Sequence, residues 1–364
     1  MRGRLVMAVG AALLLAAGCG SGGGGDSAPA GGDRPGEEAA TVALFLPESK
    51  TTRYEQFDKP VFEAELKQLC PDCGFLYFNA DQDAAKQQSQ VESALTQGAD
   101  VLVLDAVDAD AVAPLVNQAK QKKIPVIAYD RRISGIGYEY FVSFDNVKVG
   151  EVQGQALLDE LNRRGTATTG QIVMINGSPT DPSSADYKKG AHNALDGKVT
   201  IGREFDTPDW SPDKAQEQME QAITSLGRDS IVGVYSANDG MATGAVAALK
   251  RAGYATLPAL TGQDAELAAV QRILTGEQTM TIYLNIKEQA GNAAQAAVAL
   301  AKGEAPRTNA TVNNGTADIP STLLDPIAVT KDTIKDTIVA DGFYAASDIC
   351  TPDIAAACTE AGLP

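Results

Sequence analysis

Short runs of apolar residues, rich in β-branched and aromatic side chains, alternate along the chain with longer segments in which apolar residues recur every three or four positions. Runs of the first kind indicate strands buried on both faces, and segments of the second kind indicate amphipathic helices. The pattern predicts strands over residues 41–46, 75–79, 101–104, 126–129, 140–144, 171–175, 199–205, 231–235, 259–261 and 280–283. It predicts helices over residues 54–69, 84–96, 111–122, 147–162, 213–224, 240–251, 266–274 and 286–302.

Strands that are apolar throughout and separated by helices indicate parallel sheets covered by helices on both faces. The predicted strands are too numerous for one simple sheet, and the body from residue 41 onward is long enough for two lobes of about 150 residues each. We therefore expect an α/β fold built from two doubly wound, parallel-sheet lobes.

The N-terminus carries a targeting signal. Arg2 and Arg4 precede an apolar run over residues 5–17, and Gly18 stands before Cys19. A basic start, a short apolar run and a small residue at the end are typical of a secretory signal peptide. The run is shorter than the roughly 20 residues that a helix needs to cross a bilayer.

The last residues of this signal, Leu-Ala-Ala-Gly-Cys19, resemble the lipobox of bacterial lipoproteins, although Ala16 stands where leucine is usual. The alternative is an ordinary secretory signal with a chance cysteine. The lipoprotein interpretation is favoured because residues 20–36, rich in Gly, Ser, Pro and Ala, are typical of a flexible tether. The sequence predicts a signal peptide over residues 1–18 and a lipidated tether over 19–40 that holds the body at the outer face of the cell membrane.

Composition excludes several partners. The formal net charge is −17, and an acidic surface repels nucleic acid and anionic lipid, so membrane attachment is expected only through the lipid anchor. An acidic surface does not exclude a neutral ligand.

The number and spacing of the cysteines are consistent with an exported protein. Apart from Cys19, four of the five cysteines fall in two close pairs, and we favour disulfides within the pairs Cys70/Cys73 and Cys350/Cys358, although three connectivities are possible. A redox role for the first pair is disfavoured because it follows a predicted helix, where no helix N-terminus lowers a thiol pKa. Zinc is disfavoured because His192 is the only histidine. We expect no metal and no cofactor.

Polar side chains follow the predicted strands at the ends where doubly wound sheets bind ligands. A carboxylate accepts two hydroxyl protons and an arginine donates a fork of hydrogen bonds, which suits the neighbouring hydroxyls of a sugar. The alternative is helix capping. We favour capping for Asp105 and Asp145, and ligand binding for Asp130-Arg131, because a cap does not require the arginine. The other strand-end pairs are Asn238-Asp239 and Gln263-Asp264.

Trp210, the only tryptophan, lies between two prolines in the loop Thr-Pro-Asp-Trp-Ser-Pro. A core tryptophan usually lies inside an element, whereas an aromatic ring at a rim can stack on the C–H face of a sugar ring. We therefore interpret Trp210 as a stacking residue. Tyr54 is a weaker candidate because it could pack beneath its own helix.

Several stretches, each weak alone, are specific in their order and spacing, and they extend from residue 41 to about 343. They resemble the D-xylose-binding branch of the periplasmic pentose- and hexose-binding proteins that serve ABC importers. The stretches are Ala-Tyr-Asp130-Arg131, Phe-Val-Ser-Phe-Asp145-Asn146, Asn176-Gly-Ser-Pro-Thr-Asp181, Tyr-Ser-Ala-Asn238-Asp239, Gly262-Gln-Asp264-Ala-Glu-Leu, Thr279-Met-Thr-Ile-Tyr283 and Asn313-Asn-Gly.

The resemblance implies a type I periplasmic binding protein with a three-segment hinge after residue 144 and near residues 284–285 and 324–326. The N-terminal lobe would comprise residues 41–144 and 286–323, and the C-terminal lobe residues 145–284 and 326–364. The lobes would close around a monosaccharide and present it, as a monomer, to a permease. The implied sugar-binding residues are Arg53, Asp130, Arg131, Asp181, Trp210, Asn238 and Asp264, to which we add Tyr54, Ser183 and Leu284.

Two of these positions depart from the xylose-binding pattern. Leu284 stands where that pattern has a lysine that reaches the sugar, and Ser183 stands where it has an asparagine. A donor is lost and apolar space is gained, so the sequence predicts an aldose that is either xylose or a hexose such as glucose.

Three other classes of protein are alternatives to a transport receptor. A sugar-responsive repressor would begin with a basic DNA-binding segment instead of a signal peptide. An enzyme is disfavoured because His192 is the only histidine. In addition, the paired carboxylates lie beside residues that are suited to bind sugar hydroxyls. The remaining alternative is a sensor that presents sugar to a chemoreceptor or kinase.

Overall fold

The computed structural model describes residues 39–363 of the chain, and residues 39–364 form one compact unit. The predicted signal peptide, the lipidation site Cys19 and the tether up to residue 38 lie outside the described residues. Among the residues described, no helix combines the length and apolar character that a membrane crossing requires.

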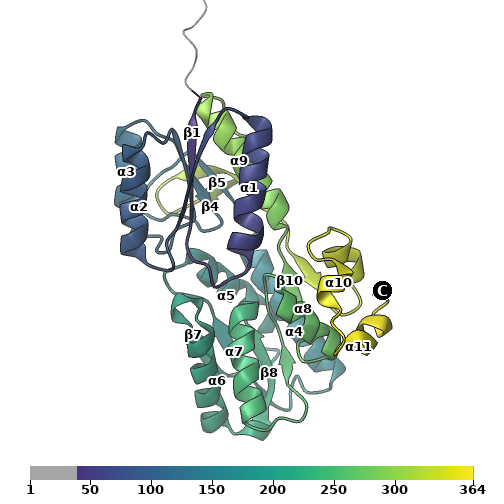
Figure 1. Cartoon of the computed structure of the whole chain (residues 1–364). Helices are drawn as coiled ribbons and strands as arrows, with labels where there is room; N and C mark the ends of the chain where they lie inside the picture. Colours follow the sequence, from purple (N-terminus) through teal and green to yellow (C-terminus); the bar gives the residue numbers. More distant parts are fainter. Residues whose placement is uncertain (1–38, 364) are drawn as a thin grey trace, which may run out of the picture. The chain divides into compact units, whose positions relative to one another are not determined.

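The first sheet has seven strands in the order β11-β12-β5-β4-β3-β1-β2 (Figure 1). All neighbours are parallel except β11 and β12. Its strands are β1 (Thr41–Leu46), β2 (Gly74–Asn79), β3 (Val101–Leu104), β4 (Val126–Tyr129), β5 (Tyr140–Phe144), β11 (Ala310–Asn313) and β12 (Asp318–Leu324).

Side chains of β1 alternate between two separate cores. Val42 and Leu44 pack with one helix group, which comprises η1 (Tyr54–Asp58), α1 (Lys59–Leu69) and α9 (Ile286–Ala301). Ala43 and Phe45 pack with the other, which comprises α2 (Ala84–Thr96) and α3 (Ala113–Gln121). Figure 1 shows the two groups on opposite sides of the sheet. Burial on both faces explains why this strand is apolar at every position from Val42 to Leu46.

The second sheet has four parallel strands in the order β7-β6-β8-β9, with α4 packed against α5 and α6 against α7. Its strands are β6 (Gln171–Asn176), β7 (Thr200–Asp206), β8 (Ile231–Ser236) and β9 (Ala259–Leu260). Its helices are α4 (Asn146–Arg163), α5 (Pro182–Leu195), α6 (Pro212–Leu226), α7 (Asp239–Arg251) and α8 (Leu267–Thr275), with short turns η2 (Pro208–Trp210) and η3 (Arg228–Ser230).

The C-terminal part of the chain completes the core of the second sheet. Strand β10 (Thr281–Tyr283) pairs in antiparallel fashion with β13 (Ile327–Val329). Beyond it follow η4 (Lys335–Val339), α10 (Ala346–Ile349) and α11 (Ala355–Glu360). The structure contains the predicted disulfides Cys70–Cys73 and Cys350–Cys358.

The α/β fold with doubly wound parallel sheets is confirmed, and the structure adds elements that the pattern did not predict. Helix α5, strand β13 and the hairpin β11–β12 were not among the predicted elements, and two strand pairs are antiparallel. The four residues 314–317 between β11 and β12 are too few for the crossover that parallel strands need, so they form a hairpin.

The chain crosses between the sheets three times, after β5, between β10 and α9, and between β12 and β13. Two of the crossings are joined directly, because the backbone N–H of Asp145 donates to the carbonyl of Leu324 at 3.0 Å. The crossings coincide with the residues that the resemblance assigns to a hinge. The hinge itself and the lobe boundaries stay predictions.

Helices α4 and α5 approach closely at two glycines. A Cβ on Gly150 would lie 1.9 Å from the carbonyl oxygen of Tyr187, and a Cβ on Gly190 would lie 2.0 Å from that of Val147. No larger residue fits at either position unless the helices separate. This contact fixes α5, which begins beside the pocket described below.

We expect Gly190→Ala to lower the free energy of unfolding by about 1–3 kcal/mol, because the added methyl overpacks the helix interface. Gly291→Ala is the matched control, since a Cβ at this position in α9 meets nothing within 4 Å. The control should stabilise the protein by about 0.5–1 kcal/mol, because alanine loses less backbone entropy on folding. Urea unfolding measures both, and equal midpoints for the two variants would contradict the packing argument.

Candidate functional site

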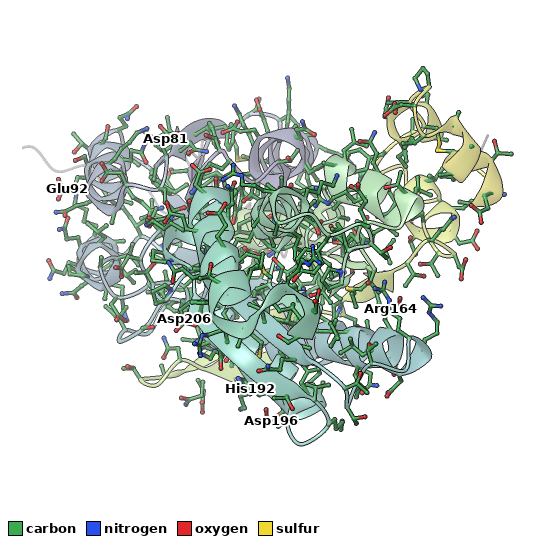
Figure 2. All side chains as sticks on the ribbon, turned by 90° about the horizontal axis from the view of Figure 1, so that it is seen from below. Asp81, Glu92, Arg164, His192, Asp196 and Asp206 are labelled. Atoms are coloured by element: carbon green, nitrogen blue, oxygen red, sulfur yellow. A yellow bond between two sulfur atoms is a disulfide. The ribbon has the colours of Figure 1, made fainter. Side chains whose placement is uncertain are left out.

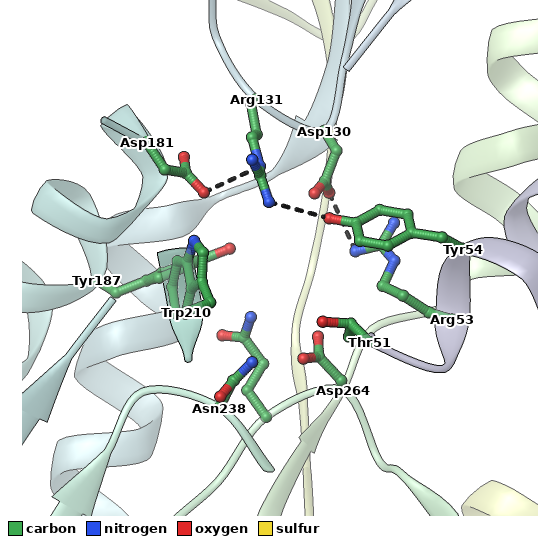
Figure 3. Close-up of a pocket in the computed structure, with 11 residues that line it drawn as sticks. Thr51, Arg53, Tyr54, Asp130, Arg131, Asp181, Tyr187, Trp210, Asn238 and Asp264 are labelled. Carbon is green, nitrogen blue, oxygen red and sulfur yellow. Dashed lines mark hydrogen bonds and ion pairs between the residues drawn. The ribbon is translucent and has the colours of Figure 1, made fainter. Parts of the chain in front are cut away.

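A cavity lies where the carboxyl ends of strands from both sheets meet (Figure 3). Eight of the ten predicted site residues line it: Arg53, Tyr54, Asp130, Arg131, Asp181, Trp210, Asn238 and Asp264. Three further lining residues were not among the candidates: Thr51, Tyr187 and Gln263. The structure therefore brings together residues that are more than 200 positions apart in sequence. Their roles toward a ligand stay predictions.

Arg53 is held on three sides. Its Nε and Nη2 donate to the two carboxylate oxygens of Asp58 at 3.0 and 2.8 Å. Its Nη1 donates to Asp130 at 3.1 Å, and its Nη2 also donates to Gln289 Oε1 at 2.7 Å. The guanidinium is buried, which alone lowers its pKa, but Asp130 and Asp58 outweigh burial, and the pKa of Arg53 lies well above its usual range.

Arg131 is held in the same manner. It donates to the carbonyl of Ala106 at 3.0 Å and to the Tyr54 hydroxyl at 3.3 Å. Its Nε lies 3.1 Å from a carboxylate oxygen of Asp181 (Figure 3). It also lies 3.4 Å from a carboxylate oxygen of Asp105. Two arginines with fixed donor geometry thus border the cavity beside Asp130 and Asp181.

The preference for Asp105 as a helix cap is wrong. Helix α3 begins only at Ala113, too far along the chain for Asp105 to reach its first turn. Asp105 is fully buried and faces Arg131 instead. Burial raises the pKa of its carboxyl, and the positive charge of Arg131 opposes this shift. Asp145 is a cap, since its carboxylate accepts from the backbone N–H of Lys148 at 3.1 Å.

Two lining residues are caps and pocket residues at once. Asp181 accepts from the backbone N–H of Ser183 at the start of α5, at 2.8 Å. Asn238 accepts from the backbone N–H of Met241 at the start of α7, at 2.9 Å. Each cap uses one side-chain oxygen. The second oxygen of Asp181 lies 3.1 Å from Arg131 Nε, and the amide nitrogen of Asn238 is not used by the cap and is available to the cavity. Capping and ligand binding are therefore compatible at these positions.

Three lining residues have left-handed backbone conformations, with φ of 62° at Asp130, 53° at Trp210 and 94° at Asp264. Such conformations cost non-glycine residues on the order of 1–3 kcal/mol each and persist where surrounding contacts impose them. At Asp130, the backbone N–H donates to Val142 and the carbonyl accepts from the Ser143 hydroxyl. Strain concentrated at one cavity indicates a functional site.

Trp210 borders the cavity opposite Tyr54 and Arg53 (Figure 3). Its indole is only 8% exposed and packs edge-on against Tyr187, with ring centroids 6.3 Å apart. The slot for the indole exists because position 177 has no side chain: a Cβ on Gly177 would lie 2.0 Å from Trp210 Cη2. The indole is thus fixed at the edge of the cavity.

Asp264 differs from the other two lining carboxylates. Asp130 and Asp181 are paired with arginines, whereas Asp264 forms no ion pair among the residues that the structure describes. Burial raises the pKa of Asp264 to about 7; the charge of Arg53 lowers it, and those of Glu266 and Asp130 raise it further. This carboxylate lacks a fixed counter-charge and can accept hydrogen bonds from a ligand.

Ser183 and Leu284 do not line the cavity. Leu284 is fully buried in the hydrophobic core of the second sheet. The Ser183 hydroxyl is buried at the start of α5, and it has no hydrogen-bond partner within residues 39–363.

His192 lies on α5 away from the cavity, between Asp196 at 2.8 Å and Glu204 at 3.1 Å (Figure 2). Within the described part of the chain, no group of three or more His, Cys, Asp or Glu residues could hold a metal ion.

The sequence contains only weak indications that the three other lining residues belong to the site. Tyr187 belongs to α5, whose buried face consists largely of Ser, Gly and Ala residues and so lacks a clear apolar period. Thr51 lies in the loop after β1, with no motif around it. Gln263 was recognised at a strand end, but only its neighbour Asp264 was selected.

The family described as "Periplasmic binding protein domain" matches residues 42–305. The D-xylose-binding periplasmic protein of Escherichia coli K12 is 34% identical over 313 residues, which cover 85% of this chain and 92% of the relative. The protein of the same name from Haemophilus influenzae is 37% identical over 313 residues, with 85% and 91% covered. A solute-binding protein of an ABC transporter from Clostridium phytofermentans, solved with bound β-D-glucose, has a TM-score of 0.80 at 28% identity, covering 85% of this chain and 99% of the other.

A cavity at the carboxyl ends of two doubly wound sheets, together with these matches, defines a solute-binding protein and not an enzyme. The chain belongs to the periplasmic binding protein family, in the branch of the D-xylose-binding periplasmic proteins.

We expect Gly177→Ala to displace the Trp210 indole, because the new methyl would overlap three ring carbons at 2.0–2.4 Å. As the only tryptophan of the chain, Trp210 reports this directly. Acrylamide should quench the fluorescence of the variant more strongly than that of the wild type, with a loss of about 1–3 kcal/mol in stability. Gly291→Ala should leave quenching unchanged, and unchanged quenching in Gly177→Ala would refute the slot.

Proposed function

We propose that this protein is an extracytoplasmic receptor that binds one aldose, xylose or a glucose-like hexose, and delivers it to an ABC importer. The single observation that carries the proposal is the cavity, in which two arginine forks, carboxylates and an indole converge. Planar charged groups bind neighbouring hydroxyls through pairs of hydrogen bonds. The xylose-binding and glucose-bound relatives support a sugar as the ligand.

The balance of charge favours a neutral ligand. Arg53 and Arg131 are already paired with Asp130, Asp181 and the carboxylates behind them. An anionic ligand would compete with these pairs and would meet the negative charge of Asp264. A sugar hydroxyl instead donates to a carboxylate and accepts from a guanidinium, so it leaves no charge unpaired.

The identity of the sugar is affected by a donor that this chain lacks, because Leu284 lies in the core and does not line the cavity. The xylose-binding pattern places a lysine there, and this chain has an apolar side chain in the core. Loss of that ammonium group removes one hydrogen-bond donor to the sugar. A relative with xylose in its name and a fold neighbour with bound glucose support five- and six-carbon aldoses equally.

We further propose that the two sheets, with their helices, close around the ligand as lobes. Polar contacts from one sheet to the other support this: Lys50 Nζ donates to the carbonyl of Asp209 at 2.8 Å, and Arg132 pairs with Asp186 at 3.2 Å. Contacts available only to the closed arrangement, together with ligand bonds, shift the population toward it. The receptor would act as a monomer, tethered through Cys19 to the outer face of the membrane.

D-xylose or D-glucose should raise the melting temperature of the purified protein, by the equivalent of about 2.7 kcal/mol at a hundredfold excess over the dissociation constant. Asp264→Asn should weaken binding in calorimetry at least about tenfold, because a hydrogen bond to a charged group contributes about 1.5–3 kcal/mol. Trp210→Ala should also weaken binding, because the ring surface for stacking on the sugar is lost. Asp229→Asn is the control, since this carboxylate is 92% exposed. A wild-type protein that binds no monosaccharide would overturn the proposal.

Affinity for the sugar should depend on pH through Asp264. A ligand that donates to the ionised carboxylate binds more weakly once the carboxyl is protonated, so affinity should fall below the pKa of about 7, by up to about tenfold per pH unit. In the free protein the sign is opposite: because the folded pKa exceeds its ordinary value, Asp264 stabilises the fold at low pH, and this is lost as pH rises through 7. Calorimetry from pH 5.5 to 8 tests the first effect, and Asp264→Asn should remove most of the slope.

A further inference from the structure

Beside the cavity lies a buried carboxylate that the binding site does not use. Asp239 is fully buried at the start of α7 and does not line the cavity. Its Oδ1 accepts from Gln278 Nε2 at 2.7 Å, and its Oδ2 accepts from the Thr281 hydroxyl at 2.8 Å and from the backbone N–H of Glu266 at 3.0 Å. Burial of a carboxylate is costly unless several donors bind it. A buried carboxylate with three donors is therefore expected to have a role.

These contacts enclose the loop that carries Asp264. The backbone N–H of Asp264 donates to Ile282 at 2.9 Å, that of Ala265 to the Thr281 hydroxyl at 3.2 Å, and that of Glu266 to Asp239. In addition, the backbone N–H of Asp239 donates to the carbonyl of Gln263 at 2.9 Å. Three consecutive backbone N–H groups are therefore bound by β10 or by Asp239, and two of them depend on the Asp239–Thr281 pair.

The loop needs this support because its conformation is strained. Asp264 and Ala265 have φ of 94° and 49°, in the left-handed region that side chains other than glycine disfavour. Two such residues in succession cost on the order of 1–3 kcal/mol each. Without the hydrogen bonds from Asp239 and Thr281, the loop would relax toward ordinary backbone angles, and the carboxylate of Asp264 would leave the cavity.

A second layer fixes Asp239. Arg272 donates from Nε to Gln278 Oε1 at 3.0 Å and from Nη2 to the backbone carbonyl of Asp239 at 3.3 Å. Gln278 thus has its oxygen toward the arginine and its amide toward the carboxylate. If the Gln278 amide were flipped, its N–H₂ group would face the Arg272 guanidinium, donor against donor. The Gln278 amide must therefore donate toward position 239, which requires an acceptor such as a carboxylate there.

We propose that Asp239 is a positioning residue that sets the affinity and specificity of the cavity by holding the strained Asp264 loop, without touching the ligand. The inference rests on the proposed sugar-binding function. It predicts that an isosteric change at position 239 acts through Asp264. In Asp239→Asn one acceptor becomes a donor, which opposes either Gln278 or the Thr281 and Glu266 pair.

The first test is a double-mutant cycle of Asp239→Asn and Asp264→Asn, read by calorimetry with D-xylose and D-glucose. Asp239→Asn should weaken binding about tenfold or more in the wild-type background and have little further effect once Asp264→Asn is present. A merely structural role would give the same fold-change in both backgrounds, and that result would overturn the proposal. A Trp210→Ala background should leave the Asp239→Asn effect undiminished, because the two sites are independent.

The second test does not need a ligand. Hydrogen–deuterium exchange of the segment containing residues 263–266 should be faster in Asp239→Asn, and in Thr281→Val, than in the wild type. Asp83→Asn is the matched control, because Asp83 caps α2 on the other sheet. Unchanged exchange in both loop variants would overturn the proposal even where the wild type binds sugar. If the wild type binds no aldose, the sugar proposal fails, and exchange alone decides whether Asp239 holds the loop.

Discussion

Arg53 and Arg131 bring two positive charges into the interior at the carboxyl ends of the first sheet, where each requires a nearby negative charge because unpaired buried ions are costly. Asp58 and Asp105 supply that charge from behind the cavity, and Asp130 and Asp181 supply it from the cavity wall. The two carboxylates behind the wall do not line the cavity, yet without them each arginine would keep only one carboxylate partner, from the cavity wall. The orientation of both guanidinium groups follows from this pairing.

The same pairing separates the lining residues into two kinds. Donors held between carboxylates are fixed before any ligand arrives, so little side-chain entropy remains to be lost on binding. Asp264 and Trp210 are fixed differently, through strained backbone and through a slot without a side chain. The cavity is therefore prepared in advance by charge on one side and by backbone geometry on the other.

Much of this arrangement could be predicted from the sequence because parallel sheets collect the ends of their strands at one edge. Asp130, Arg131, Asn238 and Asp264 were found by that rule alone, and Arg53 and Asp181 through the resemblance to sugar-binding proteins. Asp105 was misjudged because a carboxylate at a strand end was interpreted as a cap from its residue type, although the next predicted helix begins only at residue 111. Tyr187 was missed because α5 packs through small residues, and its periodicity is too weak to predict a helix.

The close contact at Gly150 and Gly190 has a consequence for how this family can diverge. Because the two helices meet backbone to backbone, neither can accept a bulkier side chain without a compensating change in its partner, so these positions are expected to vary together or not at all. The opposite side of α5 carries no such restriction. Over evolutionary time, substitutions in α5 should therefore accumulate on its exposed side, at positions such as Ala185 and Lys189, while the side that bears Tyr187 and Gly190 stays nearly constant.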